Sequence, residues 1–311
     1  MNDVDALELT HALAGVDIGG TKIAVVLVDD AGRILARGEV AAPASSGGDA
    51  MVDAAAGLVA GLAAGAPVRA VGVGAAGVVD HRTGEIRAAS ELFHDWAGFP
   101  LGERLSARLD APVRVENDVN AFLLGEVAWG AAREADVLGV MLGTGVGGAV
   151  VLDGVLRHGP HGAAGEIGHT PGYSDVRCTC GQVGHLETIA SGTSIGRRYV
   201  ERTGRTVDAV RVAEYARGGD PDAKAVFDDA GRALALACAT ASGIVEVGTA
   251  VIGGGVARSW DLLQPSIERT LRTDAPISGV PLRIVPGMLG GDAVALGAAS
   301  VARNHLHAPV L

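Results

Sequence analysis

The feature that most constrains this chain is a glycine turn between two apolar runs, and the sequence contains it twice. In the first copy, the turn Gly19–Lys22 joins the runs Gly15–Ile18 and Ile23–Val28. In the second copy, the turn Gly143–Gly148 leads into the run Ala149–Leu152. Two apolar runs joined by a short glycine turn are typical of a β-hairpin. The repeat indicates an internal duplication, in which two such hairpins can face one cleft.

The first turn has the residue types that hold phosphate groups. Gly19 and Gly20 let backbone amides approach phosphate oxygens, and Lys22 adds positive charge after Thr21. Asp17, on the strand before the turn, is suited to hold a hydrated magnesium ion. The turn predicts a nucleotide-phosphate site built on a hairpin. The alternative is an ordinary glycine-rich β-turn.

Two stretches have the G-x-G-x-x-G spacing of dinucleotide-binding loops, Gly72–Gly77 and Gly143–Gly148. Such a loop must open a helix, because the pyrophosphate sits on the helix N-terminus. The residues that follow, Val78–Val79 and Ala149–Leu152, favour strands instead. The sequence therefore disfavours a nicotinamide enzyme.

A third glycine loop, Gly253–Gly255, ends the apolar run Thr249–Ile252 and precedes a segment that can form a helix, Ala257–Leu271. Three glycines leave room for a flat ring or a phosphate against the backbone. The loop is a candidate adenosine contact, and the alternative is a tight connection between a strand and a helix.

Length and charge narrow the function classes. The 311 residues are enough for two lobes, and the net charge of −11 with no basic cluster makes nucleic acid a poor partner. The acidic start Met1–Asp5 does not fit a secretory signal, and no stretch fits a membrane span, so we expect a soluble cytoplasmic protein without a membrane partner. Three cysteines argue against a disulfide framework and leave metal binding open.

Apolar runs alternate with alanine-rich stretches along the whole chain, which predicts an α/β protein. The segments expected to be helical are 51–64, 101–109, 119–130, 223–242 and 259–271, and those expected to be strands are 113–115 and 282–285. Residues 41–49 read as a flexible loop, and 218–221 as a turn before a helix.

The short strand before residue 116 ends in three polar residues, Glu116, Asn117 and Asp118, directly before an apolar helix. Asp118 is therefore expected at or beside a helix N-terminus, where free amides and the macrodipole stabilise its anion. One interpretation is a plain N-cap. The other is a carboxylate that abstracts the proton of a sugar hydroxyl, with Asn117 fixing a hydroxyl beside it.

Two histidines and two cysteines follow within seventeen residues. This set of two nitrogens and two sulfurs suits tetrahedral zinc, and the alternative is that the side chains only pack or face solvent. The residues are His169, Cys178, Cys180 and His185. A zinc ion here would hold the loop that carries Glu166 and Glu187 and would fix the tautomer of His169.

Taken together, these motifs resemble those of the ROK family of sugar kinases and repressors, from Gly15 to about Ala302. The resemblance implies an α/β, actin-like or ribonuclease H-like fold with two lobes and an internal duplication. The implied lobes are residues 1–116 with about 295–311, and residues 117–294 with the zinc loop. It also implies an enzyme that closes on a hexose, uses MgATP, and assembles as a homodimer or homotetramer.

The resemblance also implies roles for residues at the matching positions. Asp118 takes the position of the general base. The expected sugar contacts are Gly77, Ser90, Glu91, Asn117, Asp118, Glu166, His169 and Glu187. The expected nucleotide contacts are Asp17, Gly19, Gly20, Thr21, Lys22, Gly143, Thr144, Gly145, Gly254 and Gly255. The expected ligands of a structural zinc are His169, Cys178, Cys180 and His185.

Two positions depart from the family pattern. His185 stands where the family usually has a third cysteine, and imidazole can replace thiolate on zinc. Glu91 stands where glucokinase-like members usually have Asn, so its charge changes which hydroxyl or acyl group the pocket accepts.

The expected activity is transfer of the γ-phosphoryl group of ATP to a sugar hydroxyl, with the 6-hydroxyl of glucose as the favoured acceptor. The alternatives are another hexose, an N-acetyl hexosamine, or a sugar-sensing protein of the family that does not bind DNA. Repressors of the family carry a winged helix-turn-helix before the kinase-like part, and fourteen residues precede Gly15 here.

Overall fold

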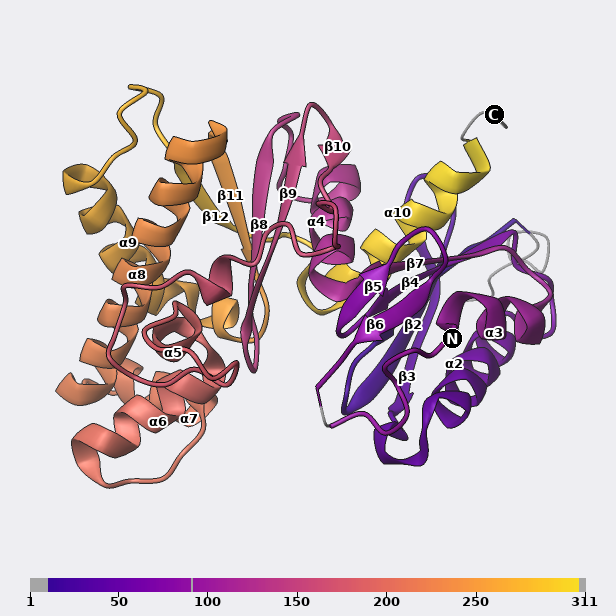
Figure 1. Ribbon diagram of the computed structural model, residues 1–311, viewed down its shortest axis with the longest axis horizontal. Helices are drawn as coiled ribbons and strands as arrows, with labels where there is room; N and C mark the ends of the chain where they lie inside the picture. Colours follow the sequence, from indigo (N-terminus) through magenta and orange to yellow (C-terminus); the bar gives the residue numbers. More distant parts are fainter. Residues whose placement is uncertain (1–10, 91, 308–311) are drawn as a thin grey trace. The chain divides into compact units, whose positions relative to one another are not determined.

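The computed structural model describes residues 11–90 and 92–307, which divide into two compact units (Figure 1). Unit 1 contains residues up to 130, a short segment 158–163, and residues from 288 onward. Unit 2 contains residues 131–157 and 164–287. The expected lobe boundary at residue 116 differs from the unit boundary at residue 130 by one helix, which belongs to unit 1.

Unit 1 is built on a five-stranded sheet. Its strands, in spatial order, are β3 (Ile34–Ala41), β2 (Lys22–Val28), β1 (Leu13–Ile18), β4 (Ala70–Ala75) and β7 (Val113–Asn117). The first three are antiparallel neighbours, so the first glycine turn joins β1 to β2 as a hairpin. The strands β1, β4 and β7 run parallel, which brings their carboxyl ends to one edge.

Helices cover both faces of this sheet. Val16, Ile18 and Val73 project from one face into a core shared with α2 (Gly48–Leu62) and α3 (Leu101–Leu109). On the other face, α10 (Ala293–His307) lies along β1 and β4 and packs against α4 (Asp118–Trp129). Smaller elements complete the unit: β5 (Val78–Asp80), β6 (Glu85–Ala88), and the 3-10 helices η1 (Ala44–Ser46) and η4 (Gly290–Asp292).

Unit 2 repeats the same plan. Its strands, in spatial order, are β10 (Val155–Leu156), β9 (Val146–Leu152), β8 (Val137–Leu142), β11 (Thr249–Gly253) and β12 (Arg283–Pro286). The second glycine turn joins β8 to β9 as an antiparallel hairpin, and β8, β11 and β12 are parallel. The two sheets therefore share strand order and direction, which confirms the predicted internal duplication.

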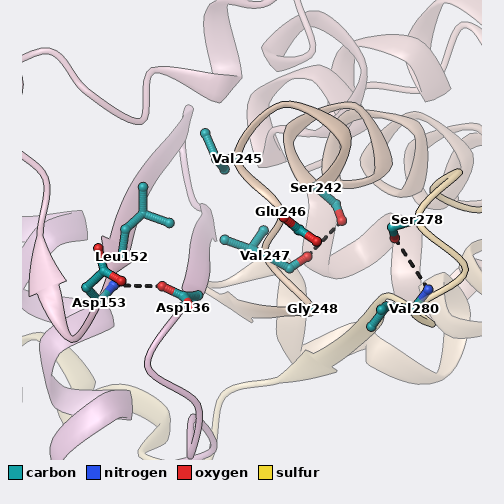
Figure 2. A pocket seen from close by; sticks show the side chains of 10 residues that line it. All are labelled: Asp136, Leu152, Asp153, Ser242, Val245, Glu246, Val247, Gly248, Ser278 and Val280. Atoms are coloured by element: carbon teal, nitrogen blue, oxygen red, sulfur yellow. Dashed lines mark hydrogen bonds between the residues drawn. The ribbon is translucent and has the colours of Figure 1, made fainter.

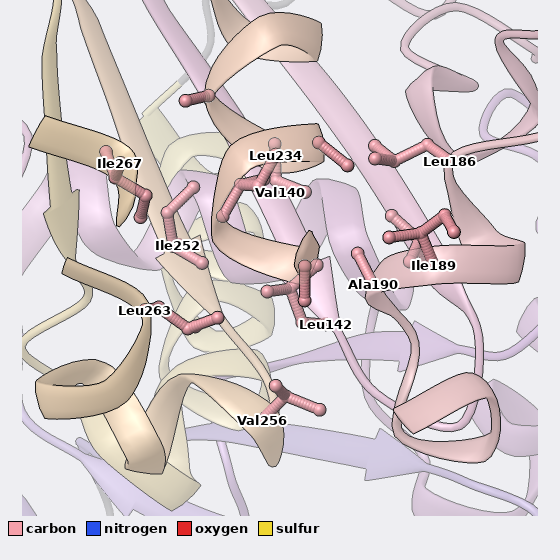
Figure 3. Packing of buried hydrophobic residues seen from close by; sticks show 14 of the residues in the cluster. Val140, Leu142, Leu186, Ile189, Ala190, Leu234, Ile252, Val256, Leu263 and Ile267 are labelled. Atoms are coloured by element: carbon pink, nitrogen blue, oxygen red, sulfur yellow. The ribbon is translucent and has the colours of Figure 1, made fainter. Parts of the chain in front are cut away.

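Unit 2 is more helical than unit 1. Its helices are η2 (Ile167–His169), α5 (Glu187–Ala190), α6 (Gly192–Thr203), α7 (Ala209–Arg217), α8 (Pro221–Val245), η3 (Val256–Ser259) and α9 (Trp260–Thr273). Figure 3 shows Leu142 and Ile252 of the sheet packing with Leu234 of α8 and Ile189 of α5, all buried. Burial of such a side chain contributes about 1.5–3 kcal/mol, so this cluster anchors the sheet to its helices.

The helices and strands predicted from the sequence are present; the ends of 101–109 agree, and those of the other segments differ by up to three residues. The turn at residues 218–221 and the strands after both G-x-G-x-x-G stretches are confirmed. The flexible loop expected at 41–49 was wrong, because η1 and the start of α2 lie there, and Ala44 and Gly48 are buried. Of the helices in the described residues, none combines the length and apolar character that a bilayer span requires.

Candidate functional site

The carboxyl edge of the unit 1 sheet gathers the predicted catalytic residues. The register places Ile18 beside Ala75, and Ala75 beside Asn117. Because neighbouring strands lie about 4.8 Å apart, the ends of β1 and β7 are separated by about 10 Å. The first glycine turn and Asp118 follow directly from these ends. This is the edge at which open α/β sheets bind their ligands.

Asn117, and not Asp118, is the N-cap of α4. Its Oδ1 accepts hydrogen bonds from the amides of Val119 (2.9 Å) and Asn120 (3.3 Å). Its Nδ2 donates to the Gly77 carbonyl (3.0 Å) and to Oδ1 of Asp118 (2.9 Å). Asp118 is therefore the first residue of the helix, where its anion also accepts from the Val119 amide (3.0 Å). The helix macrodipole favours a negative charge at this position.

Asp17 lies near Asp118 in an unfavourable setting for a second negative charge. Burial and, to a smaller extent, the charge of Asp118 raise the pKa of Asp17 to about 7, although Lys22 lowers it. Lys22 itself pairs with Glu39 at 2.9 Å, and both side chains are exposed. Two carboxylates that repel each other are suited to share a cation or a proton.

The second glycine turn is held by the start of α6. The Gly143 carbonyl accepts a hydrogen bond from the Gly192 amide (2.8 Å), and the Thr144 carbonyl accepts from Oγ1 of Thr193 (2.9 Å). Ser191 caps the helix through the Ser194 amide. The N-terminus of a twelve-residue helix therefore adjoins the turn, where it can attract an anion. The sequence analysis missed this helix, although Ser191 before a run with helical spacing was a signal for it.

The third glycine loop lies beside the second turn. Gly254 has φ +86°, and a Cβ there would lie 2.5 Å from the carbonyl oxygen of Leu142, the residue before Gly143. Gly254 is thus required for backbone packing. Gly255, in contrast, has no atom of the described residues within 4 Å of its Cβ position. The structure therefore brings together the predicted nucleotide contacts Gly143, Thr144, Gly145, Gly254 and Gly255.

The four predicted zinc ligands meet in one cluster of unit 2, with their ligand atoms all within 4.8 Å of one another. Nδ1 of His169 and Nδ1 of His185 are 3.3 Å apart, Sγ of Cys180 is 3.3 Å from Nδ1 of His185, and Sγ of Cys178 is 3.8 Å from Nδ1 of His169. Tetrahedral zinc with the usual bond lengths needs ligand separations of about 3.3–3.8 Å. The residues therefore fit the metal, and His185 fits in the position of the usual cysteine.

The predicted sugar contacts of unit 2 adjoin this cluster. Nε2 of His169 points away from the other ligands and lies 3.8 Å from Oε2 of Glu166. Oε2 of Glu187 accepts from the Val146 amide (3.0 Å), and its Oε1 accepts from Oγ1 of Thr179 (2.8 Å). Glu187 thus ties the cysteine loop to the second hairpin. No local sequence pattern indicates this contact.

The remaining sugar contacts expected from the sequence lie in unit 1. Gly77 has φ +107°, and its carbonyl binds the Asn117 side chain. Ser90 is exposed, and its carbonyl accepts from the Phe93 amide (3.1 Å). Glu91 lies outside the described residues.

A separate cavity of about 470 Å³ lies at the amino ends of β8 and β11, away from the glycine turns at their carboxyl ends (Figure 2). Asp136 accepts a hydrogen bond from the Asp153 amide (2.7 Å), and Oγ of Ser242 donates to the Val247 carbonyl (2.7 Å). Glu246 adds a third carboxylate to the lining. No residue predicted for the site lines this cavity, so the site predicted from the sequence is not there.

Comparison with known proteins identifies relatives of this chain. The sequence profile of the ROK family matches residues 13–305. A glucokinase of Streptomyces coelicolor is 32% identical over 93% of this chain and 97% of that protein. An N-acetyl-D-glucosamine kinase of Salmonella paratyphi B is 34% identical over 86% of this chain and 91% of that protein.

The crystal structure of a ROK family glucokinase from Streptomyces griseus, in complex with glucose and AMPPNP, has the same fold. It matches this structure with a TM-score of 0.82 and 33% identity over 94% of this chain and 99% of that one. This likeness confirms the predicted fold class, an actin-like or ribonuclease H-like α/β fold with an internal duplication.

Proposed function

Because this chain belongs to the ROK family, we propose that it is an ATP-dependent hexose kinase in which Asp118 is the general base. The observation that carries this assignment is the end of β7. There Asn117 orients the Asp118 carboxylate with a 2.9 Å hydrogen bond, and Asp17 is close enough for the charge of Asp118 to raise its pKa. A sugar hydroxyl at this edge would find a base that the helix N-terminus keeps ionised.

In the proposed reaction, Asp118 accepts the proton of the sugar hydroxyl while the hydroxyl oxygen attacks the γ-phosphorus of ATP. The bond between that phosphorus and the bridging oxygen breaks, and ADP leaves. Magnesium bound with ATP supplies positive charge to the phosphate oxygens. Asp17 would hold this ion, whose positive charge would lower the pKa of the carboxyl group.

The phosphates are assigned to backbone amides of the two glycine turns. Gly19, Gly20 and Thr21 supply one set, with Lys22 adding charge, and Gly143, Thr144 and Gly145 supply the other. The open position at Gly255 leaves room for the adenosine, and Gly254 shapes that loop.

The sugar is assigned to polar side chains that orient its ring. These are Asn117, Glu166, His169 and Glu187, and the family resemblance adds Gly77, Ser90 and Glu91. A structural zinc on His169, Cys178, Cys180 and His185 would fix the Nδ1 of His169 and leave Nε2 for a hydroxyl. From the family resemblance and the acidic net charge, we expect a cytoplasmic homodimer or homotetramer without a nucleic-acid partner.

Glucose is the first candidate acceptor, since relatives from Streptomyces coelicolor and Streptomyces griseus are glucokinases. N-acetyl-D-glucosamine is the second, because a similarly close relative is a kinase for that sugar. Glu91 is the residue at which the two pockets are expected to differ.

ADP release from MgATP, measured with glucose, mannose, allose, fructose and the N-acetyl hexosamines, tests the activity. We expect turnover with glucose. The Asp118→Ala variant should keep sugar binding by calorimetry and lose about a hundredfold or more in kcat, the scale of general-base catalysis. Absence of turnover with every sugar would exclude the kinase, and near-normal kcat in Asp118→Ala would exclude the base.

A further inference from the structure

A buried ionic cluster in unit 1 has no role in the reaction described above. Nε2 of His158 lies 2.9 Å from Oε1 and 3.1 Å from Oε2 of Glu116, and Glu116 is only 7% exposed. Oε2 of Glu116 also accepts from Nδ2 of Asn120 (3.3 Å). The His81 ring stacks on His158, with ring centroids 3.6 Å apart and planes 9° from parallel. A buried carboxylate with this set of partners is held in one orientation.

His158 stands where the chain enters unit 1. Residues 131–157 belong to unit 2, residues 158–163 to unit 1, and residues 164–287 to unit 2 again. The six-residue segment 158–163 is thus a short part of unit 1 between two segments of unit 2. The contact between His158 and Glu116 holds the first residue of this segment to β7.

Glu116 and its partner Asn120 lie on either side of Asn117 and Asp118 in the sequence. Glu116 is the residue before Asn117 on β7, and Asn120 is in the first turn of α4. The hydrogen bond from Asn120 to Glu116 therefore spans Asn117 and Asp118 and restrains the strand-to-helix turn that carries them. His158 contacts both oxygens of the same carboxylate.

We propose that Glu116 and His158 are positioning residues that hold the Asn117–Asp118 turn in its reactive geometry. The proposal rests on the proposed function of Asp118. A small displacement of a general base costs much rate, because proton transfer requires hydrogen-bond distance to the hydroxyl. Sugar affinity also depends on Glu166, His169 and Glu187, and nucleotide affinity on the glycine turns, so both should change much less than kcat.

The other charged groups around the cluster do not provide an alternative partner for Glu116. Asp80 binds the Arg82 amide and the Arg87 side chain, and Arg114 lies two residues before Glu116 with its Nη1 donating to the Val113 carbonyl. Burial lowers the pKa of His81, so the ring stacked on His158 is neutral near pH 7. Among the described residues, loss of His158 would therefore leave Asn120 as the remaining side-chain partner of Glu116.

The test compares His158→Ala, His158→Gln and Glu116→Gln with His161→Ala, an exposed histidine in the same segment. For His158→Ala and Glu116→Gln we expect kcat to fall about tenfold to a hundredfold, the scale for a misplaced catalytic group, with KM for hexose and ATP within about threefold. Gln at position 158 keeps an N–H donor near the position of Nε2, so it should restore most of kcat. His161→Ala should behave like the wild type.

Hydrogen exchange of the Val119 and Asn120 amides provides a readout that does not need activity. Both should exchange faster in His158→Ala and return toward wild-type rates in His158→Gln. Unchanged exchange, a raised KM with normal kcat, or failure of Gln to rescue would each overturn the positioning role. If the wild type phosphorylates no hexose, the proposed function fails, and exchange alone then decides whether the cluster restrains the turn.

Discussion

Asp17 should reduce the stability of the ligand-free protein as the pH rises, and its replacement by Asn should remove that loss. The pKa of Asp17 is raised from 3.8 to about 7 in the folded protein. Between these values the folded state holds a proton that the unfolded state has released. Stability therefore falls as pH rises from about 4 to about 7, and the loss persists above pH 7.

The size of the effect follows from the width of this window. Each pH unit over which only the folded state keeps the proton corresponds to about 1.36 kcal/mol. The window spans about three pH units, which gives about 4 kcal/mol as an upper figure. Asn resembles the protonated carboxyl group and does not titrate. Asp17→Asn should thus match the wild type near pH 4 and exceed its free energy of unfolding by up to about 4 kcal/mol at pH 8.5.

Urea unfolding in magnesium-free buffer from pH 4.5 to 8.5 measures this difference. A Trp260→Phe background leaves Trp96 and Trp129 as fluorescent reporters of unit 1. Asp110→Asn, at an exposed position of the same unit, controls for the change of charge.

The companion variant Asp118→Asn removes one cause of the raised pKa of Asp17, so the titration of Asp17 should move to lower pH. A stability difference between Asp17→Asn and wild type that is the same at pH 4.5 and 8.5 would refute the reasoning. So would a variant less stable than the wild type at pH 8.5.

Three further predictions concern other parts of the chain. Gly72→Ala should fail to give soluble folded protein, because its Cβ would lie 1.7 Å from the Ala298 carbonyl oxygen. Gly255→Ala should fold normally and raise the KM for ATP. Thermal melts measure the first effect and steady-state kinetics the second. Glu126→Gln should lower the free energy of unfolding by about 1–3 kcal/mol in urea titrations, because the buried Glu126 uses both oxygens to accept the amides of Met288 and Leu289 and Gln offers one acceptor. Purified protein should contain one zinc ion per chain by mass spectrometry. The Cys180→Ala variant should lose the zinc together with most of the sugar affinity. Full loss of zinc with unchanged sugar affinity would contradict the link between the metal and the sugar.

Local patterns were sufficient to predict the hairpins, the strand-to-helix junction at Asn117 and Asp118, and the cluster of two histidines and two cysteines. The glycine turns lie within single hairpins, so adjacent residues define them. Asn117 and Asp118 stand at a strand-to-helix junction that both neighbouring segments mark. The metal ligands lie within one short segment, and their spacing was enough to predict a cluster that the structure contains.

Contacts between distant segments could not be predicted in the same way. Glu187 binds the Val146 amide, 41 residues away, and His158 binds Glu116, 42 residues away. Nothing in either local sequence specifies the partner, because both depend on how separate elements pack. The grouping of α4 with unit 1 has the same origin, since it follows from packing against α10 near the far end of the chain.

Single glycines also differ in whether local sequence or distant packing explains them. Gly72 belongs to a stretch with dinucleotide-loop spacing, but it is needed because α10 packs closely against β4. A Cβ placed on Gly72 would lie 1.7 Å from the Ala298 carbonyl oxygen. Gly143 and Gly255 have no atom of the described residues closer than 4.0 Å to a Cβ placed on them. Open space before a backbone amide is what a phosphate or a flat ring requires. This open space separates Gly143 and Gly255 from Gly72, and a spacing rule cannot detect it.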